Sequence, residues 1–172
     1  AVPGSKYSVP KVDLSTPDGA AKALTSPNSE TRYLAWTAIQ KMGPDKAGQA
    51  LNKLWKGSDQ RHRARSLWAL GKMAGKGQSA VDMALADKNP DIRIVGIRLA
   101  RQLGIDVTAI VAKVVRDESA AVRREAAIAL RFDDSAEGDG LWADLALQHD
   151  GKDRWYLEAL GIGSDLNADP RF

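Results

Sequence analysis

The sequence predicts an all-α fold, in which about five short helix pairs stack into an α–α superhelix, or solenoid. The first observation is an Arg that returns at spacings of 31, 30, 30 and 31 residues. Secondly, most of these arginines are followed by a small residue three places on and apolar residues seven and ten places on, which marks one helix face. Thirdly, no segment alternates with a period of two, so strands are not expected. The anchor arginines are Arg32, Arg63, Arg93, Arg123 and Arg154.

The helix that carries each anchor has recognisable start and stop signals. Residues of N-cap type and early acids precede the anchors, and Pro90 suits a first helical position. Gly43, Gly104 and Gly161 follow the apolar runs and predict helix ends. The start signals are Asn28–Glu30, Ser58–Asp59, Asn89–Asp91 and Glu118–Ser119.

A second, shorter apolar segment lies beside each anchor helix and is expected to form its partner helix. A single pair cannot cover its own apolar face, so stacked pairs would share one continuous core. The acidic segment FDDSAEGDG, residues 132–140, is expected to be a solvated loop, with calcium binding as the weaker alternative. The partner segments are Gly19–Leu24, Lys46–Trp55, Ser79–Ala86, Val107–Val115 and Leu141–Leu147.

The two ends of the chain fall outside the repeat pattern. Residues 1–16 contain Pro3 and Pro10 without periodicity, so we expect an extended linker or arm. Residues 17–163 form the repeat domain. Residues 164–172 form a tail that leads to a missing C-terminal region, because the last repeat has no capping helix and the chain looks excised from a longer one.

Composition excludes several classes of site. The chain has no Cys, which excludes disulfides, thiolate metal sites and covalent haem attachment within it. Its two histidines, His62 and His149, have no paired spacing, and no phosphate loop or nucleophile motif appears, so we expect no catalytic, cofactor or metal residues. No apolar run is long enough for membrane insertion. A net charge of +3, from 25 basic and 22 acidic residues, is too small for a dedicated DNA binder.

Asp87 and Asp117 lie six residues before Arg93 and Arg123, which gives the spacing D-x-x-x-x-[IV]-R. This spacing, with the small and apolar residues after it, resembles the HEAT-repeat family. The resemblance implies short HEAT-like repeats joined by an Asp–Arg ladder, with Ser26 in place of the acid before Arg32. The ladder residues implied are Arg32, Arg63, Asp87, Arg93, Asp117, Arg123 and Arg154.

Three longer stretches carry a narrower resemblance: YSVPKVDLSTPDGAAKAL, SPNSETRYLAWTAI and HDGKDRWYLEALGIGSD. They look like the HEAT-like segment of large exported planctomycete proteins that resemble membrane-bound sugar dehydrogenases. Those proteins join a propeller, a HEAT-like segment and a c-type cytochrome domain. The resemblance implies a periplasmic or exported parent with haem c elsewhere. It implies no cofactor and no catalysis in this chain, which lacks CxxCH.

A candidate partner face lies beside the anchors. Positions one, five and eight after an anchor share a helix face away from the core, and four arginines occupy such positions. In HEAT arrays this face lines the concave side, so it is the best surface for a partner, against the simpler interpretation of a solvated face. The candidates are Trp68, Arg98, Arg101, Arg124 and Arg131, with Trp155 as a second exposed Trp. We expect Arg123 to stabilise the fold and Arg124 to face the groove with little effect on stability.

Three functions compete. The first is a non-catalytic scaffold that binds proteins or the flanking domains of a parent chain. The second is a HEAT-like DNA-binding or DNA-glycosylase-type protein, for which a basic concave groove and Trp would engage the nucleic acid. The last is a chromophore-lyase-like protein, and the repeat length is the only observation that supports it.

Overall fold

A computed structural model describes Gly4 and residues 11–165. Every regular element among these residues is a helix, which confirms the all-α class. By its internal contacts the chain divides into two compact units, Ala1–Ala69 (unit 1) and Leu70–Phe172 (unit 2). The single array over residues 17–163 therefore stays a prediction. Most of the expected arm and tail, residues 1–3, 5–10 and 166–172, lies outside the described residues.

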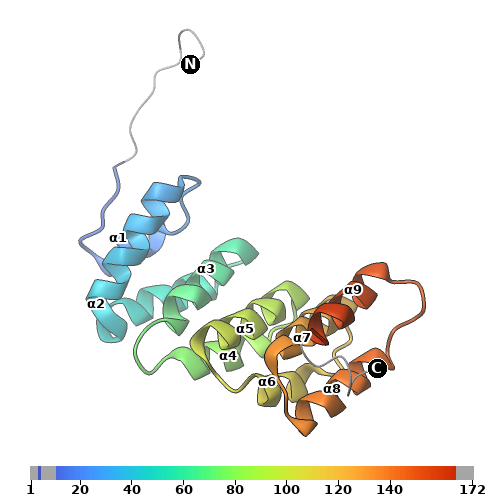
Figure 1. Cartoon of the computed structure of the whole chain (residues 1–172). Coiled ribbons are helices and arrows are strands. Elements are labelled where there is room, and N and C mark those ends of the chain that lie inside the picture. The colour runs from blue at the N-terminus through green and yellow to red at the C-terminus, as the bar shows by residue number, and fades with distance from the viewer. Residues whose placement is uncertain (1–3, 5–10, 166–172) are drawn as a thin grey trace. The chain divides into compact units, whose positions relative to one another are not determined.

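Unit 1 is built from helices that begin at well-formed N-caps (Figure 1). The hydroxyl of Thr16 accepts from the amide of Gly19, and the side chain of Asn28 accepts from the amide of Thr31. The second helix breaks where the sequence predicts a helix end, since Gly43 has φ 75° and ψ 174°. The helices are α1 (Pro17–Ala23), α2 (Ser29–Trp55) and α3 (Gln60–Gly71), whose last two residues belong to unit 2.

The core of unit 1 lies between these helices. Ile39, Leu51 and Leu67 are completely buried, and each contributes about 1.5–3 kcal/mol relative to an exposed side chain. Ser66, three places after its anchor, is also buried, and its hydroxyl donates to the carbonyl of Leu51 over 2.6 Å. The small residue expected at this position therefore lets α3 approach α2 closely.

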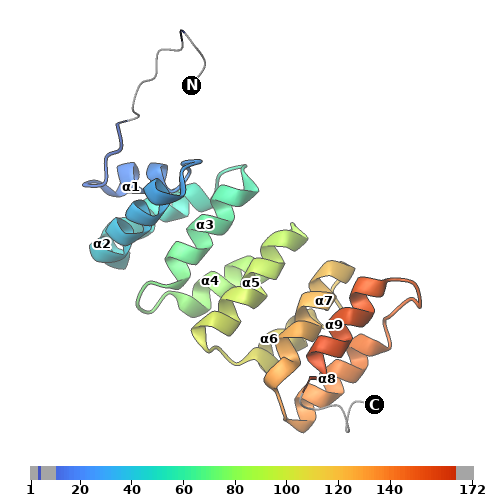
Figure 2. The same cartoon turned by 45° about the horizontal axis from the view of Figure 1, so that its top comes forward.

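Unit 2 contains three consecutive helix pairs. Helices α5, α7 and α9 lie side by side as one layer, and α6 and α8 form the other layer behind them (Figures 1 and 2). Helix α4 packs against α5. The elements are α4 (Gly77–Leu85), α5 (Pro90–Leu103), α6 (Val107–Val114), α7 (Ala120–Ala129), the 3₁₀ turn η1 (Leu130–Phe132), α8 (Ala136–Ala146) and α9 (Arg154–Gly163).

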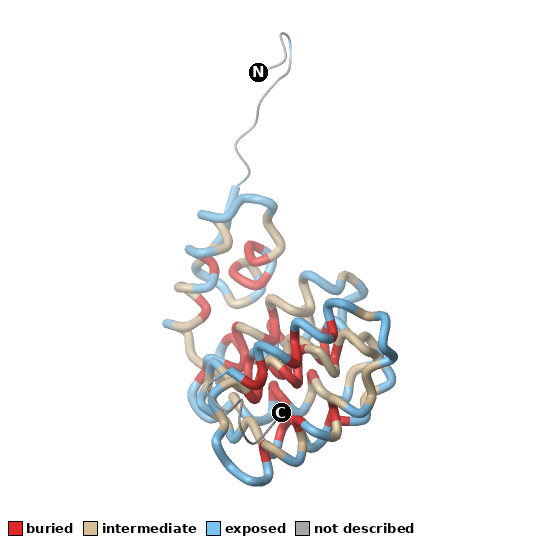
Figure 3. The backbone as a smooth tube through the Cα atoms, turned by 45° about the vertical axis from the view of Figure 1, so that its right-hand side comes forward, coloured by how far each residue is buried: buried red, intermediate tan, exposed pale blue. Residues whose placement is uncertain are grey.

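The helix faces that meet inside each unit carry the buried residues (Figure 3). In unit 2, Leu99, Val111 and Leu145 are completely buried. Glycine allows the closest approaches: a Cβ on Gly96 would lie 2.9 Å from the Cβ of Ala84. These contacts fix α5 and α7 so that their other faces point away from the core.

The acidic segment at residues 132–140 is not the loop expected from its composition. Ser135 caps a helix, because its hydroxyl accepts from the amide of Gly138 over 3.0 Å, and α8 begins at Ala136. Two of the acids that suggested a solvated loop, Glu137 and Asp139, lie in the first turn of this helix, where carboxylates interact favourably with the helix dipole. Asp133 and Asp134 precede the helix and keep the irregular structure that was expected.

Among the described residues, no helix is long and apolar enough to cross a membrane.

Candidate functional site

The turn before each anchor arginine has the same backbone geometry in all five repeats. The amide of the residue six places before the anchor donates to the carbonyl three residues earlier, over 2.9–3.2 Å. We call this residue the ladder position. Only two of the five ladder positions are acidic, so the implied ladder has few carboxylates available to it. The ladder positions are Ser26, Gly57, Asp87, Asp117 and Gln148.

Within unit 2, Arg93 binds both the carbonyls of the turn before it and the carboxylate of the next repeat. Its Nη1 donates to the carbonyls of Asp87 and Lys88, over 2.9 and 3.1 Å. Its other edge binds Asp117 of the next repeat through two bonds, Nε to Oδ2 at 2.7 Å and Nη2 to Oδ1 at 2.8 Å. Both side chains are only 9% exposed. The hydrogen bond to Asp117 raises the pKa of Arg93, so the guanidinium is a fixed charge at this joint.

Arg123 repeats the carbonyl contacts without a carboxylate. Its Nη1 donates to the carbonyls of Asp117 and Glu118, over 2.6 and 3.3 Å. The ladder position opposite it is Gln148, and its Nε instead contacts the hydroxyl of Tyr156 over 3.4 Å. The guanidinium also lies 5.6 Å from the ring of Tyr156. An aromatic ring thus takes the place of the acid in this joint.

In unit 1, Arg32 shows the same carbonyl contacts. Its Nη1 donates to the carbonyls of Ser26 and Pro27, over 3.0 and 2.7 Å. Arg63 is arranged differently: its Nε donates to the carbonyl of Trp55 over 3.0 Å, and its guanidinium stacks 4.2 Å from that indole ring.

Arg154 is placed on the surface of α9 rather than in a joint. Its side chain is 82% exposed, and its Nε contacts Glu158, one turn later, at 3.4 Å. Asp150 closes the preceding turn instead, because its Oδ1 accepts from the amides of Asp153 and Lys152. These two amides lower the pKa of Asp150.

The predicted partner face forms a real depression in unit 2, which we call the partner groove. It runs across α5, α7 and α9, has a volume of about 640 Å³ and includes positions one and five after each of the three anchors in these helices, but position eight only in α9. Arg101 and Arg131, which were predicted for this face at position eight, do not line it. Arg98 and Arg124 line it as predicted. Its lining combines apolar and basic side chains, among them Ile94, Ile128, Ile162, Trp155, Arg98 and Arg124.

The arginine at position 98 is tied to a buried acid that the sequence analysis missed. Nη2 of Arg98 lies 2.6 Å from Oε2 of Glu125, and Arg101 is 4.0 Å from the same carboxylate. The carboxylate is 8% exposed, whereas the Arg98 side chain is 58% exposed. The bond to Glu125 raises the pKa of Arg98. No spacing in the sequence distinguishes Glu125 from a solvent-facing acid, so this pair needed the structure.

The other two predicted arginines are also paired. Nη1 of Arg124 binds Oδ2 of Asp153 at 2.8 Å, with side chains 31% and 25% exposed. This half-buried ion pair was not expected, since Arg124 was predicted to face the groove with little effect on stability. Asp153 is the N-cap of α9, and that role was readable from its place before the anchor. Arg131 binds Asp165 at 2.5 Å and lies 5.0 Å from the ring of Phe132.

The two tryptophans predicted to be exposed differ. Trp155 is 72% exposed and lines the partner groove. Trp68 is half-buried, belongs to unit 1 and does not line the groove. Trp142 in contrast is buried, with its indole N–H donating to the carbonyl of Leu160. Trp155 is therefore the aromatic residue of the candidate site.

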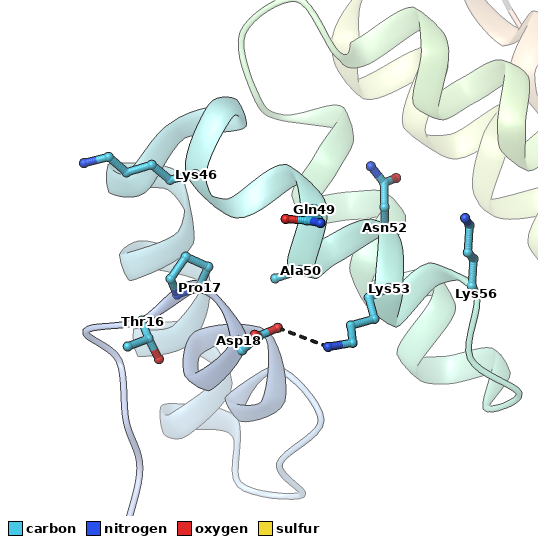
Figure 4. A pocket seen from close by; sticks show the side chains of 9 residues that line it. All are labelled: Thr16, Pro17, Asp18, Lys46, Gln49, Ala50, Asn52, Lys53 and Lys56. Atoms are coloured by element: carbon cyan, nitrogen blue, oxygen red, sulfur yellow. Dashed lines mark ion pairs between the residues drawn. The ribbon is translucent and has the colours of Figure 1, made fainter.

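A second depression lies within unit 1 between the start of α1 and the second half of α2 (Figure 4). It has a volume of about 730 Å³ and is lined by Lys46, Lys53 and Lys56. Lys53 lies 3.8 Å from Asp18, but both side chains are more than three-quarters exposed, so this pair contributes little to stability. The three lysines that line this pocket make this surface of unit 1 basic.

A scan of family models matches none along this chain, and a search of curated proteins also finds no match. The resemblance to the HEAT-like segment of exported dehydrogenases therefore stays a prediction from the residues quoted above.

Proposed function

We propose that the chain is a non-catalytic scaffold and protein-interaction module, whose partner groove receives a polypeptide segment with an apolar or aromatic side chain. The observation that carries this proposal is the exposure of Trp155 in a depression lined by three isoleucines. Exposed aromatic residues grouped with aliphatic side chains are typical of binding surfaces, where they supply most of the affinity.

The charges around the groove support a polypeptide rather than a nucleic acid. Arg98 is bound by Glu125 and Arg124 by Asp153, so both guanidiniums already have carboxylate partners. A phosphate backbone needs cations that release counterions when they bind it. The paired arginines instead form a polar rim around an apolar centre, which is the usual anatomy of protein interfaces. A DNA shift assay at low salt tests the alternative DNA-binding function, and sequence-independent binding there would favour it.

The wider setting rests on the sequence resemblance alone. The chain would be a HEAT-like solenoid segment within a larger exported protein that resembles a sugar dehydrogenase and carries haem c in another domain. Its partners would then be the flanking domains of that protein. The open reading frame that encodes the chain tests this setting, since it would contain a propeller pattern and a CxxCH motif.

Site-specific photo-crosslinking tests the groove itself. A photoreactive phenylalanine analogue replaces Trp155 in one variant and Leu147 in the control. Leu147 is 85% exposed in the same unit but does not line the groove. We expect position 155 to crosslink to one discrete polypeptide segment and Ile128→Asp to abolish that product. Equal labelling from both positions, or labelling that Ile128→Asp leaves unchanged, would contradict the proposal.

A further inference from the structure

The net positive charge of the chain resides in unit 1. Residues 1–69 contain eleven Lys and Arg against five Asp and Glu, a net charge of +6. Residues 70–172 contain fourteen against seventeen, a net charge of −3. The basic excess therefore belongs to unit 1, whereas the partner groove belongs to unit 2. Unit 1 needs its own explanation for this excess.

The Nε–Nη2 edge of the Arg32 guanidinium could bind a carboxylate, but no carboxylate of the described residues contacts it. Its Nη1 binds the carbonyls six and five places before it, as Nη1 of Arg93 does. In Arg93 the remaining edge, Nε and Nη2, binds both oxygens of Asp117. In Arg32, no contact of this edge occurs within the described residues. The reason lies at the ladder position of the next repeat, where Gly57 replaces the aspartate.

Two more guanidinium groups lie in the neighbourhood of Arg32. Nη1 of Arg65 donates to the carbonyl of Leu24 over 2.9 Å, two residues from the carbonyl that Arg32 binds at Ser26. Arg61 lies one turn before Arg65 on α3 and is exposed. Burial and the neighbouring charges of Arg32 and Arg61 lower the pKa of Arg65, and the smaller effect of the nearby Asp59 carboxylate opposes them. Among the described residues, no ion pair joins any of these three arginines to an acid.

We infer that Arg32, Arg61 and Arg65 form a binding site for an acidic segment of a partner protein, in which an Asp or Glu carboxylate binds the Nε–Nη2 edge of Arg32. The pair between Arg93 and Asp117 is the model for this site. There, an arginine whose Nη1 binds the carbonyls at the equivalent two positions also binds a carboxylate through Nε and Nη2. Arg61 and Arg65 would receive a second acid of the same segment. Arginine is suited to this role because its rigid fork matches a carboxylate with two parallel bonds.

The site is tested by fluorescence anisotropy with a labelled poly-glutamate peptide at low salt. Arg32→Ala is expected to weaken binding about tenfold or more, as for a lost charge-assisted pair. Lys41→Ala removes the same charge from an exposed position on the same helix and is the matched control. We expect it to weaken binding less than about threefold, since it acts only through screened long-range attraction. Equal losses from both variants would overturn the proposal, because they would show an effect of net charge alone.

A gain-of-contact variant gives an independent test. Gly57→Asp restores the acid at the ladder position, so it should occupy Arg32 from within, weaken peptide binding by a similar factor and raise the melting temperature. A side chain there requires a small shift of the turn, because a Cβ would lie 3.1 Å from the carbonyl of Leu54. The equivalent turn in unit 2 carries Asp117, whose amide makes the same hydrogen bond to the carbonyl three residues earlier. Gly57→Asn is the uncharged control and should bind the peptide as the wild type does. Unchanged peptide binding by Gly57→Asp would refute the site.

Two further arms identify the source of the acid and separate this site from the partner groove. A labelled oligothymidylate that binds more tightly than the peptide, with loss in Arg32→Ala, would show a nucleic-acid site and overturn the assignment to a protein. Trp155→Ala should leave peptide binding unchanged, because Trp155 lines the groove of unit 2. Loss of peptide binding in Trp155→Ala would place the acidic segment in the groove instead.

Discussion

Replacing Arg93 by Met should be among the most destabilising single substitutions on the anchors. The change removes the guanidinium but keeps an apolar stem of similar length. It leaves Asp117 with its carboxylate 9% exposed and without its two bonds to Arg93. It also leaves the carbonyls of Asp87 and Lys88 without their donor.

The expected cost follows from these contacts. Breaking a buried ion pair by removal of one partner costs about 3–5 kcal/mol, because the remaining charge stays buried. For a chain of 172 residues, each kcal/mol lowers the melting temperature by about 2–4 °C. Arg93→Met should therefore lower it by about 6–20 °C, measured by circular dichroism at neutral pH. The carboxylate of Asp117 keeps one bond, from the amide of Ser119, which favours the lower half of this range.

A matched control removes an arginine from an exposed pair. Arg116 lies 3.4 Å from Asp144, with side chains 75% and 42% exposed, and such pairs contribute about 0–1 kcal/mol. Arg116→Met should thus shift the melting temperature by less than about 4 °C. The double variant Arg93→Met with Asp117→Leu should recover part of the loss, since it removes the uncompensated charge. Similar small shifts for Arg93→Met and Arg116→Met would refute the ladder at this joint.

Three other predictions follow from single contacts. Arg124→Glu sets two carboxylates against each other in a partly buried pair, so the free energy of unfolding in urea should fall by about 1–2 kcal/mol, with Arg124→Gln losing less. Gly163→Ala drives a Cβ into a backbone carbonyl of α7 and should cost about 1–3 kcal/mol in thermal unfolding, whereas Gly161→Ala meets no atom within 4 Å and should cost nothing comparable. Hydrogen bonds, first of all from the hydroxyl of Thr16, lower the pKa of Asp13 from 3.8 to about 2. The stabilisation of the α1 start is then complete above pH 3.8 and lost as the pH falls through about 2. The protection factors of the amides in the first turn of α1 should fall over that window in the wild type and show no such pH step in Asp13→Asn.

The sequence was sufficient for the helices because each depends on local signals. Period, caps and glycine stops place α5 and its end at Gly104, where φ is 66°. The beginning of α8 was missed since Gly138 and Gly140 suggested a loop, although Ser135 is an ordinary N-cap. In such a segment the cap outweighs the composition.

The candidate site was only partly predictable, and the reason is that pairing across repeats is non-local. The face of Arg98 and Arg124 follows from helical period alone. Whether those arginines are free depends on Glu125 and Asp153, which lie 27 and 29 residues further along the chain. Spacing in sequence does not report such pairs, because it depends on how neighbouring helices are rotated.

The geometry of the anchors also explains why an arginine recurs where the acid does not. In Arg32, Arg93 and Arg123, Nη1 binds the carbonyls of the residues six and five places earlier. Those carbonyls belong to the turn that follows the preceding helix, where backbone acceptors lack helical donors. This contact needs only the repeat's own residues, and three of the five anchors make it in the described residues. The second edge of the guanidinium reaches the next repeat and meets Asp117 or the hydroxyl of Tyr156, or in Arg32 no acid of the described chain. The contact of Nη1 with the carbonyls of the preceding turn therefore accounts for the recurring arginine. The Nε–Nη2 edge binds different partners in different repeats.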